Sequence, residues 1–432
     1  MDKNRYIIYS TLLSFESLNK EIKYILNQQF TENIEGRDRR FITEIVYGTT
    51  RQRLNLDWKI KSVYKGIFKN IDKKLLVLLR MSVYQIFFCK NIPDYATVNT
   101  SVEISRKINK KYTSICNGIL RSIIRNRNTF NTNSLKIDDL SNYYSHPKWL
   151  IEKWLKAWTL EDVIKLMKWN NKRPEIWFRF NSKKISTEKF SKEYNPLKKN
   201  KYIDNYFTFS NTQSILESDI FKNGILTVQN PTSGIIIELL NIEKQDAILD
   251  ACAAPGGKSS YIYNKMLKTN TLTCLEINKH RYEILKANFK SIPENLFIKN
   301  INFLKYAPKV QFDKILLDVP CIGTGVMSKR SDLRWLKKPK DININKKLHL
   351  QMLNKATTLL SKKGAIIYST CSIEKEDSTY IVNEFLKNNN NFTIESPKKN
   401  INDIFIQNDG TLLILPHKHN IDGGYAAKLV RK

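Results

Sequence analysis

Three segments of this 432-residue chain each end an apolar run with residues that can do chemistry. AILDACAAPGGKSS (247–260) has an acid and then Ala-Pro-Gly-Gly, ILLDVPCIGTG (315–325) has Asp318 and Cys321, and IIYSTCS (366–372) has Cys371. Each apolar run is predicted to be a strand of a parallel sheet. Open α/β sheets bind ligands at the carboxyl ends of their strands, so both thiols are expected beside a ligand site.

The glycine-rich segment 247–260 is typical of a loop that binds a nucleoside ligand. Its small residues let the backbone approach a ligand closely, and the helix predicted after it offers free N–H groups to an anion. A P-loop would need glycine where Cys252 stands, and the G-x-G-x-x-G fingerprint is absent. Glu276, at the end of the next predicted strand, is positioned to bind ribose hydroxyls. S-adenosylmethionine fits these features best, and a purely structural glycine turn is the alternative.

Two thiols beside a nucleoside site favour covalent chemistry on a pyrimidine. Carbon 5 of the ring is a poor nucleophile, but addition of a thiolate at carbon 6 makes an enamine whose carbon 5 attacks an electrophilic methyl group. A base must then remove the carbon 5 proton so that the thiol leaves, and Asp318 could bind the ring amine and nitrogen 3. A lone cysteine is more often a buried core residue. These residues alone do not show which of the two thiols attacks the ring.

Taken together, DACAAPGGK, LLDVPCIGTG and YSTCS resemble the RNA cytosine-5 methyltransferases of the Sun (RsmB) type. In that family a Cys-Ala-Ala-Pro-Gly-Gly-Lys loop, an Asp-Ala-Pro-Cys loop and a Thr-Cys-Ser loop follow in the same order. Upstream, DRRFITEIVYGTTR resembles an all-helical NusB-like RNA-binding domain, and SHPKWLIEKW, RPEIWFRFN and GILTVQNPTSG resemble the middle segment of these enzymes. IDGGYAAKLVRK resembles the closing strand. The resemblance covers essentially the whole chain and implies methylation of a cytosine of 16S ribosomal RNA.

The resemblance also implies a role for each residue that matches a family motif. Cys371 takes the role of the nucleophile, Cys321 assists product release, and Asp318 binds and activates the base. The cofactor S-adenosylmethionine is bound by Cys252, Ala253, Ala254, Pro255, Gly256, Gly257, Lys258, Glu276, Asn302 and Asp318.

The chain departs from the family pattern at three positions. Asn302 stands where aspartate is expected, Glu276 where aspartate is common, and Val319 where alanine is common. Asn302 still offers a carbonyl acceptor to the adenine amino group. We therefore expect weaker or retuned cofactor binding rather than its loss.

Apolar spacing divides the chain into regions of different fold class. Residues 1–130 repeat apolar positions at intervals of three and four, which predicts an all-α bundle with 72–89 at its centre, and the resemblance implies that this bundle is NusB-like. Residues 131–145 carry no strong period and are interpreted as a linker. Residues 146–228 are predicted to form a small α+β RNA-binding or connecting module, in which IWFRFN is a half-buried strand. From 229 to 432 strands and helices alternate, which predicts a doubly wound, Rossmann-like domain, and the resemblance implies that it is the methyltransferase domain.

The charge balance suits a polyanionic partner. Lys and Arg number 72 against 41 acids, giving a net charge of +31. The heavy use of Lys, Asn and Ile also fits an AT-rich genome, and this compositional bias explains the excess equally well. An unpaired or flipped cytosine of 16S ribosomal RNA is the partner that the resemblance implies.

The cysteines and the apolar runs exclude several other classes of protein. The six cysteines form no C-x-x-C pair and the chain has only five His, so we predict free thiols and no metal. The first residues lack the apolar stretch of a signal peptide, and GIIIELL is far shorter than the roughly 20 residues that span a bilayer. We therefore expect a cytoplasmic monomer without a membrane partner.

Two other functions compete with cytosine-5 methylation. Methylation of an exocyclic amine needs no thiol and typically uses an Asn/Asp-Pro-Pro-aromatic loop, whereas the loop here is Asp-Val-Pro-Cys. A ribosome-assembly or antitermination factor with a decayed catalytic half would bind RNA without chemistry. Such a factor would need neither Cys321 nor Cys371.

Overall fold

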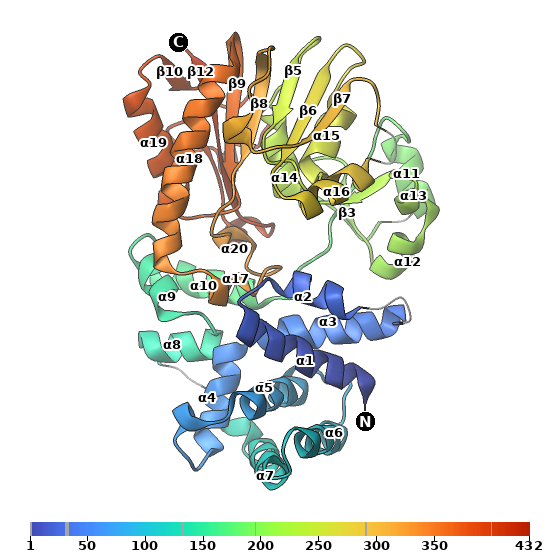
Figure 1. The fold of residues 1–432 in the computed structure, drawn as a ribbon, viewed down its shortest axis with the longest axis vertical. Helices are drawn as coiled ribbons and strands as arrows, with labels where there is room; N and C mark the ends of the chain where they lie inside the picture. The colour runs from blue at the N-terminus through green and yellow to red at the C-terminus, as the bar shows by residue number, and fades with distance from the viewer. Residues whose placement is uncertain (1, 31–33, 132–133, 195, 290–291, 399) are drawn as a thin grey trace. The chain divides into compact units, whose positions relative to one another are not determined.

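The computed structural model describes residues 2–30, 34–131, 134–194, 196–289, 292–398 and 400–432 (Figure 1). These residues form two compact units. The first consists of Met1–Arg173 and Met327–Lys338, and the second of Pro174–Val326 and Pro339–Lys432. In the described part of the chain, no helix is both long enough and apolar enough to cross a bilayer.

The first unit is helical, as the apolar spacing predicts. The core of the unit surrounds α5, because ten of its residues between 75 and 86 besides Arg80 are buried. The unit's helices are α1 (Lys3–Leu18), α2 (Ile22–Gln29), α3 (Gly36–Arg51), α4 (Arg53–Val63), α5 (Lys73–Phe88), α6 (Asp94–Ile108), α7 (Tyr112–Arg125), α8 (Ile137–Tyr144), α9 (Lys148–Leu155), α10 (Leu160–Asn171) and α17 (Leu333–Leu336).

The segment 131–145, interpreted as a linker, contains the helix α8. Two carboxylates in its first turn, Asp138 and Asp139, interact favourably with the helix dipole. Leu140 is buried, and the Tyr143 ring packs edge-on against Trp58. Eight residues are too few to establish a helical period, so burial against α4 rather than local sequence specifies this helix. Our boundaries at 130, 145 and 228 follow changes of motif and remain a proposal.

The first unit also contains the distant segment Met327–Lys338. Arg334 is 1% exposed, and its Nη1 donates to the backbone oxygens of Arg51 (3.0 Å) and Ser145 (3.1 Å) and to Oδ1 of Asn171 (2.8 Å). Its Nη2 donates to the backbone oxygen of Asn170 at 2.6 Å. One guanidinium therefore satisfies four acceptors from three parts of the unit.

Replacing Arg334 by alanine is expected to destabilise the first unit by about 3–5 kcal/mol, because buried acceptors lose their donor and a cavity remains. Hydrogen exchange of the amides of α3 and α10 measures this loss. The half-buried Lys337 provides the control, since Lys337→Ala removes none of these bonds. Unchanged protection in Arg334→Ala would contradict the bridging role.

The second unit begins with a four-stranded antiparallel sheet in the order β2-β3-β1-β4. IWFRFN forms a strand as predicted, but it is not half-buried: Phe178, Arg179 and Phe180 are all buried, whereas Ile176 is exposed. Arg179 is buried because its guanidinium donates hydrogen bonds to Gln229 and Ser260. The elements are β1 (Phe178–Phe180), α11 (Thr187–Tyr194), β2 (Lys198–Lys199), β3 (Tyr206–Thr208), α12 (Thr212–Glu217), α13 (Asp219–Lys222) and β4 (Leu226–Val228).

The larger sheet confirms the predicted doubly wound α/β fold. Its strands run in the order β10-β12-β9-β8-β5-β6-β7, which Figure 1 shows from left to right. Strands β9, β8, β5, β6 and β7 are parallel, and the closing strand β12 is antiparallel to β9. The strands are β5 (Ala247–Asp250), β6 (Thr271–Glu276), β7 (Leu296–Asn300), β8 (Phe312–Asp318), β9 (Leu360–Thr370), β10 (Phe392–Ile394), β11 (Leu412–Ile414) and β12 (Gly424–Arg431).

Successive residues of the parallel strands enter two apolar cores, one on each face of the sheet. Ile248 packs in the core of α14, α15 and α16, whereas Leu249 packs in the core of α18 and α19. The carboxyl ends of β5, β6, β8 and β9 therefore lie at one edge. The helices are α14 (Pro231–Glu238), α15 (Gly257–Lys265), α16 (Lys279–Asn288), α18 (Pro339–Leu359), α19 (Thr379–Asn388) and α20 (Pro416–His419), with short 3-10 turns η3 (Phe303–Lys305), η4 (Thr324–Val326) and η5 (Lys375–Asp377).

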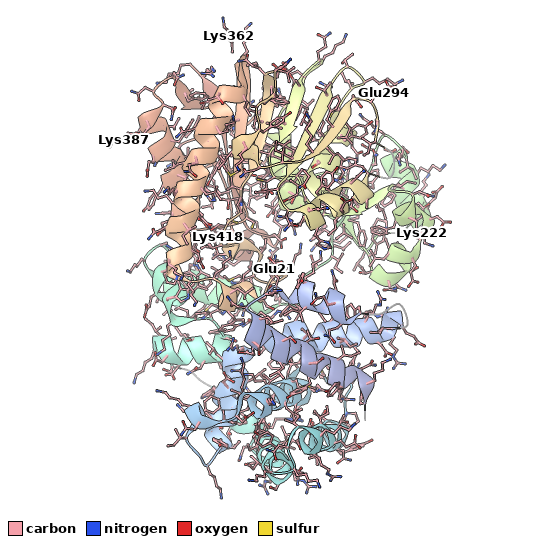
Figure 2. The ribbon with its side chains drawn as sticks, viewed as in Figure 1. Glu21, Lys222, Glu294, Lys362, Lys387 and Lys418 are labelled. Carbon is pink, nitrogen blue, oxygen red and sulfur yellow. The ribbon has the colours of Figure 1, made fainter. Side chains whose placement is uncertain are left out.

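Exposed lysines are spread over the second unit. Lys222 on α13, Lys362 in β9 and Lys387 on α19 extend outward from different elements (Figure 2). The positive charge of this unit is therefore not confined to one terminal tail.

Candidate active site

The glycine-rich loop joins β5 to α15 and is held by Asp250. This carboxylate is 1% exposed, and it accepts hydrogen bonds from Ser259 Oγ at 2.7 Å and from the Cys252 N–H at 3.4 Å. Burial raises the pKa of Asp250 to about 6. Burial likewise raises the pKa of the Cys252 thiol. Both residues therefore shape the loop, and Cys252 is unsuited to act as a nucleophile.

Gly256 is the residue of this loop that only glycine fits. Its φ is +106°, in the left-handed region, and a Cβ there would lie 2.9 Å from Leu285 Cδ1. Gly257 then begins α15, and a Cβ on it would have only Gln229 Nε2 nearby, at 3.5 Å. The loop therefore presents open backbone and a helix N-terminus, a combination that binds anionic or polar ligand groups.

Glu276 ends β6 as predicted and is 4% exposed. Its Oε1 accepts from the Asn278 N–H at 2.8 Å, and Arg281 Nη1 lies 3.5 Å from its Oε2. Arg281 also donates to the backbone oxygen of Ala254. Arg281 thus ties the acid to the glycine-rich loop, a contact that sequence reasoning missed because it joins separate turns.

Asn302 follows β7 and caps the turn η3. Its Oδ1 accepts from the Leu304 N–H at 2.9 Å. A side-chain carbonyl oxygen has two lone pairs, so one remains for a ligand. The expected acceptor is present, although the same Asn302 oxygen already accepts a hydrogen bond from the Leu304 backbone N–H.

Asp318 ends β8 and forms an ion pair with Lys258 of the glycine-rich loop. Lys258 Nζ donates to Oδ2 at 2.6 Å, and Ser369 Oγ donates to Oδ1 at 2.9 Å. Burial lowers the pKa of Lys258, but the charge and hydrogen bond of Asp318, together with other nearby groups, outweigh this effect and raise the pKa. Lys258 is therefore held as an ammonium ion. Ser369 was not predicted, because its contact depends on the pairing of Asp318 with Ser369 in the parallel register of β8 and β9.

The two predicted thiols meet. The Sγ atoms of Cys321 and Cys371 are 3.0 Å apart, and neither thiol is fully buried. Their loops are joined by the Gly325 N–H, which donates to the Cys371 backbone oxygen at 2.9 Å, and by the Ile373 N–H, which donates to Thr324 Oγ1 at 3.1 Å.

This contact couples the two thiols. The hydrogen bond between them lowers the pKa of Cys321 and raises the pKa of Cys371. Burial further raises the pKa of Cys371. The contact therefore favours a thiolate on Cys321 over one on Cys371, and the two groups titrate as a pair.

Arg179 and Gln229 form a second polar cluster near the loop. Arg179 donates to Gln229 Oε1 at 2.7 Å and to Ser260 Oγ at 2.9 Å, and Tyr206 OH donates to the same Gln229 oxygen at 2.7 Å. These bonds fix the Gln229 amide, whose Nε2 has no hydrogen-bond partner among the described residues. This buried donor faces the open side of Gly257.

Comparison with known protein families shows which families the parts of this chain match. Residues 237–430 match the model of the 16S rRNA methyltransferase RsmB/F family, residues 2–125 match the NusB family, and residues 146–196 match an RsmF/B-like ferredoxin-like domain. Residues 237–430 therefore form a domain of the RsmB/F methyltransferase family.

Curated relatives align with more than nine-tenths of this chain. The probable ribosomal RNA small subunit methyltransferase B of Bacillus subtilis is 28% identical, with 99% of this chain and 98% of the relative aligned. Ribosomal RNA small subunit methyltransferase B of Pasteurella multocida is 27% identical, with 92% and 89% aligned. This chain is accordingly an S-adenosylmethionine-dependent rRNA methyltransferase.

Solved structures confirm the multidomain fold. The crystal structure of PH0851 has a TM-score of 0.79 at 23% identity and covers 100% of this chain and 99% of its own. NSun6 from Pyrococcus horikoshii, solved with the S-adenosylmethionine analogue SFG, has a TM-score of 0.58 at 20% identity and covers 66% of this chain and 98% of its own.

The residues present fit S-adenosylmethionine. The open backbone beside Gly257 accommodates polar groups, the buried Glu276 carboxylate suits ribose hydroxyls, and Asn302 retains an acceptor for an amino group. The individual ligand assignments of Cys252 to Lys258, Glu276, Asn302 and Asp318 remain proposals.

Proposed function

We propose that this enzyme methylates carbon 5 of a cytosine in 16S rRNA through a covalent adduct between Cys371 and carbon 6. The observation that carries the proposal is the 3.0 Å contact of two thiols, Cys321 and Cys371, which follow the adjacent strands β8 and β9 beside the Asp318–Lys258 pair. Amine methylation and RNA binding alone require neither thiol.

Attack begins when the Cys371 thiol loses its proton to solvent. Cys371 Sγ then forms its bond to carbon 6, and the electrons of the carbon 5–carbon 6 double bond move into the ring. Asp318, paired with Lys258, would bind the ring amine and nitrogen 3 and stabilise the developing charge. Bound S-adenosylmethionine supplies the electrophilic methyl group for carbon 5.

Release requires the reverse movement of electrons. The proton on carbon 5 must be removed, after which the carbon 5–carbon 6 double bond re-forms and the sulfur–carbon 6 bond breaks. Cys321 as a thiolate, the form that its lowered pKa favours, is the neighbouring group suited to accept this proton, while Cys371 leaves as a thiolate. Its role is therefore product release.

The remaining features of the proposal concern the substrate. Either thiol reaches a cytosine only when the base is unstacked, so we propose an unpaired or flipped cytosine. The NusB-like region, on which Arg37 and Arg40 are exposed, would hold the RNA without doing chemistry. A cytoplasmic monomer fits this function.

Nucleoside mass spectrometry of 16S rRNA from a deletion strain tests the proposal. We expect loss of one 5-methylcytidine, restored by the wild-type gene and not by a Cys371→Ala gene. Loss of an amine-methylated cytidine instead would support the alternative reaction. An unchanged nucleoside profile would reject the proposal and favour a binding factor.

Replacing Asn302 by aspartate is expected to tighten S-adenosylmethionine binding about three- to tenfold. A carboxylate accepts a hydrogen bond from an amino group more strongly than an amide oxygen does, and it can still cap η3. Calorimetry of the full chain measures the affinity. Asn302→Ala is the opposing variant and should weaken binding, and an unchanged affinity in both variants would remove Asn302 from the cofactor site.

Replacing Gly325 by alanine is expected to lower methyl transfer about 100-fold, the scale of a 1 Å displacement of catalytic groups. A Cβ at this position would lie 2.7 Å from the Cys371 backbone oxygen and would push the two thiol loops apart. Single-turnover methylation measures the effect. Gly118→Ala is the matched control, since no described atom lies within 4 Å of the added carbon, and equal rates for the two variants would contradict the account.

A further inference from the structure

Three buried polar side chains to which the family resemblance assigns no role lie near the loop that carries Cys321. His349 comes from α18, Tyr368 from β9 and Asp377 from η5, and each is 0% exposed. Burying such groups costs free energy unless they are hydrogen-bonded. Their partners therefore indicate what they do.

Two of these side chains bind the peptide groups on either side of Cys321. His349 Nε2 lies 2.8 Å from the Pro320 backbone oxygen, and Asp377 Oδ2 accepts from the Ile322 N–H at 3.2 Å. The loop is thus fixed immediately before and immediately after the thiol-bearing residue. A displacement of either contact changes the position of the Cys321 sulfur.

Tyr368 joins the His349 side chain to the Asp377 backbone. Its hydroxyl lies 2.9 Å from His349 Nδ1 and 2.7 Å from the Asp377 backbone oxygen. The Pro320 oxygen can only accept, so His349 Nε2 carries a proton and donates it. In the neutral ring, Nδ1 and the Asp377 oxygen then compete for the single Tyr368 hydroxyl hydrogen. Tyr368 therefore contacts both groups and donates to one of them at a time.

The pKa shifts of His349 and Asp377 agree with this arrangement. Burial lowers the pKa of His349 and raises the pKa of Asp377, while the proximity of the two groups opposes both shifts. The Asp377 charge also opposes ionisation of Cys321. The carboxyl group therefore lies near enough to the thiol to affect it.

We propose that His349 and Asp377, joined by Tyr368, are positioning residues that hold Cys321 for product release. The inference rests on the proposed covalent mechanism and deepens it. Cys371 stands on its own strand end, after β9, and none of the contacts of His349 or Asp377 given above involves it. Loosening the Cys321 loop therefore slows elimination more than attack.

The test measures covalent RNA–protein complex on a denaturing gel, using the full-length enzyme, 16S rRNA and S-adenosylmethionine. His349→Leu and Asp377→Ala each remove one contact to the loop. We expect release about 10- to 100-fold slower than in the wild type, so that complex accumulates, while single-turnover methylation changes by less than about threefold. A purely structural defect would reduce methylation and complex together.

Conservative variants distinguish positioning from charge. His349→Gln retains a donor for the Pro320 oxygen, and Asp377→Asn retains an acceptor for the Ile322 N–H, so both should release RNA nearly as fast as the wild type. If Asp377→Asn accumulates as much complex as Asp377→Ala, the charge rather than the hydrogen bond matters and the positioning role is wrong.

A milder pair of variants covers the case in which the first variants do not fold. Tyr368→Phe interrupts the network with little change of volume, and it should raise the amount of complex severalfold. Tyr425→Phe is its control, because the two rings pack at 6.3 Å and the polar groups beside the Tyr425 hydroxyl are Thr411 and Thr379 rather than His349. Equal complex in both variants would overturn the inference.

Cys321→Ala separates this inference from the mechanism on which it rests. If Cys321→Ala accumulates complex and the His349, Asp377 and Tyr368 variants do not, the positioning role alone fails. If Cys321→Ala forms no complex, the proposed function itself fails.

Discussion

Replacing Cys371 by alanine is expected to abolish methyl transfer to 16S rRNA. The variant lacks the sulfur that attacks carbon 6, and carbon 5 is then too weak a nucleophile to react. We expect the rate to fall by about four orders of magnitude or more, the scale seen when a catalytic nucleophile is removed. No covalent complex with RNA should form. Transfer of a labelled methyl group from S-adenosylmethionine measures the loss.

Two controls show whether the loss of methyl transfer comes from the missing Cys371 thiol rather than from weaker cofactor binding. Calorimetry should give the same S-adenosylmethionine affinity for Cys371→Ala as for the wild type, because the cofactor is assigned to the loops after β5, β6 and β7 and to Asp318 at the end of β8, and not to the loop after β9. Cys89→Ala, which removes a half-buried thiol of the first unit, should leave methylation unchanged. A Cys371→Ala enzyme that still methylates within tenfold of the wild type would contradict the covalent mechanism.

Replacing Cys321 by alanine is expected to trap the enzyme on its substrate. Cys371 can still attack and carbon 5 can still be methylated, but the group that assists removal of the carbon 5 proton is missing. We expect release about 10²- to 10⁴-fold slower, so that a complex persists through denaturing electrophoresis. Methyl label should be present in the trapped RNA.

The assignment of Cys371 as nucleophile and Cys321 as the group that assists release can be tested directly. Each variant is incubated with RNA in the presence and absence of S-adenosylmethionine, and the double variant Cys321→Ala/Cys371→Ala serves as the control without either thiol. Complex in Cys371→Ala and not in Cys321→Ala would reverse the roles. Such a reversal would agree with the lower pKa of Cys321 in the free enzyme.

The sequence predicted the candidate site well where the signal is local. Asp318, Cys321 and Cys371 each follow an apolar run, and the strands β8 and β9 form where those runs predict them. The 3.0 Å contact of the two thiols depends instead on the pairing of β8 with β9. Pairing is a long-range property, so the local pattern predicts neighbouring loops but no distance.

The features that the sequence did not reveal are also long-range. Arg179 alternates with apolar residues and so suggested an exposed face, but Gln229 and Ser260, far along the chain, bury it. Arg334 follows the thiol loop in sequence yet folds into the first unit, where its four acceptors belong to distant helices and loops. His349 is a single histidine on a helix, and only its contact with Pro320 indicates a role.

Tandem mass spectrometry of the complex trapped by Cys321→Ala tests the central claim most directly. After digestion with nuclease and protease, we expect one peptide, containing Cys371, to carry a cytidine linked through carbon 6 to the sulfur and bearing a methyl group on carbon 5. A cytidine attached to any other residue, or a methyl group on the exocyclic amine with no linked peptide, would contradict the account.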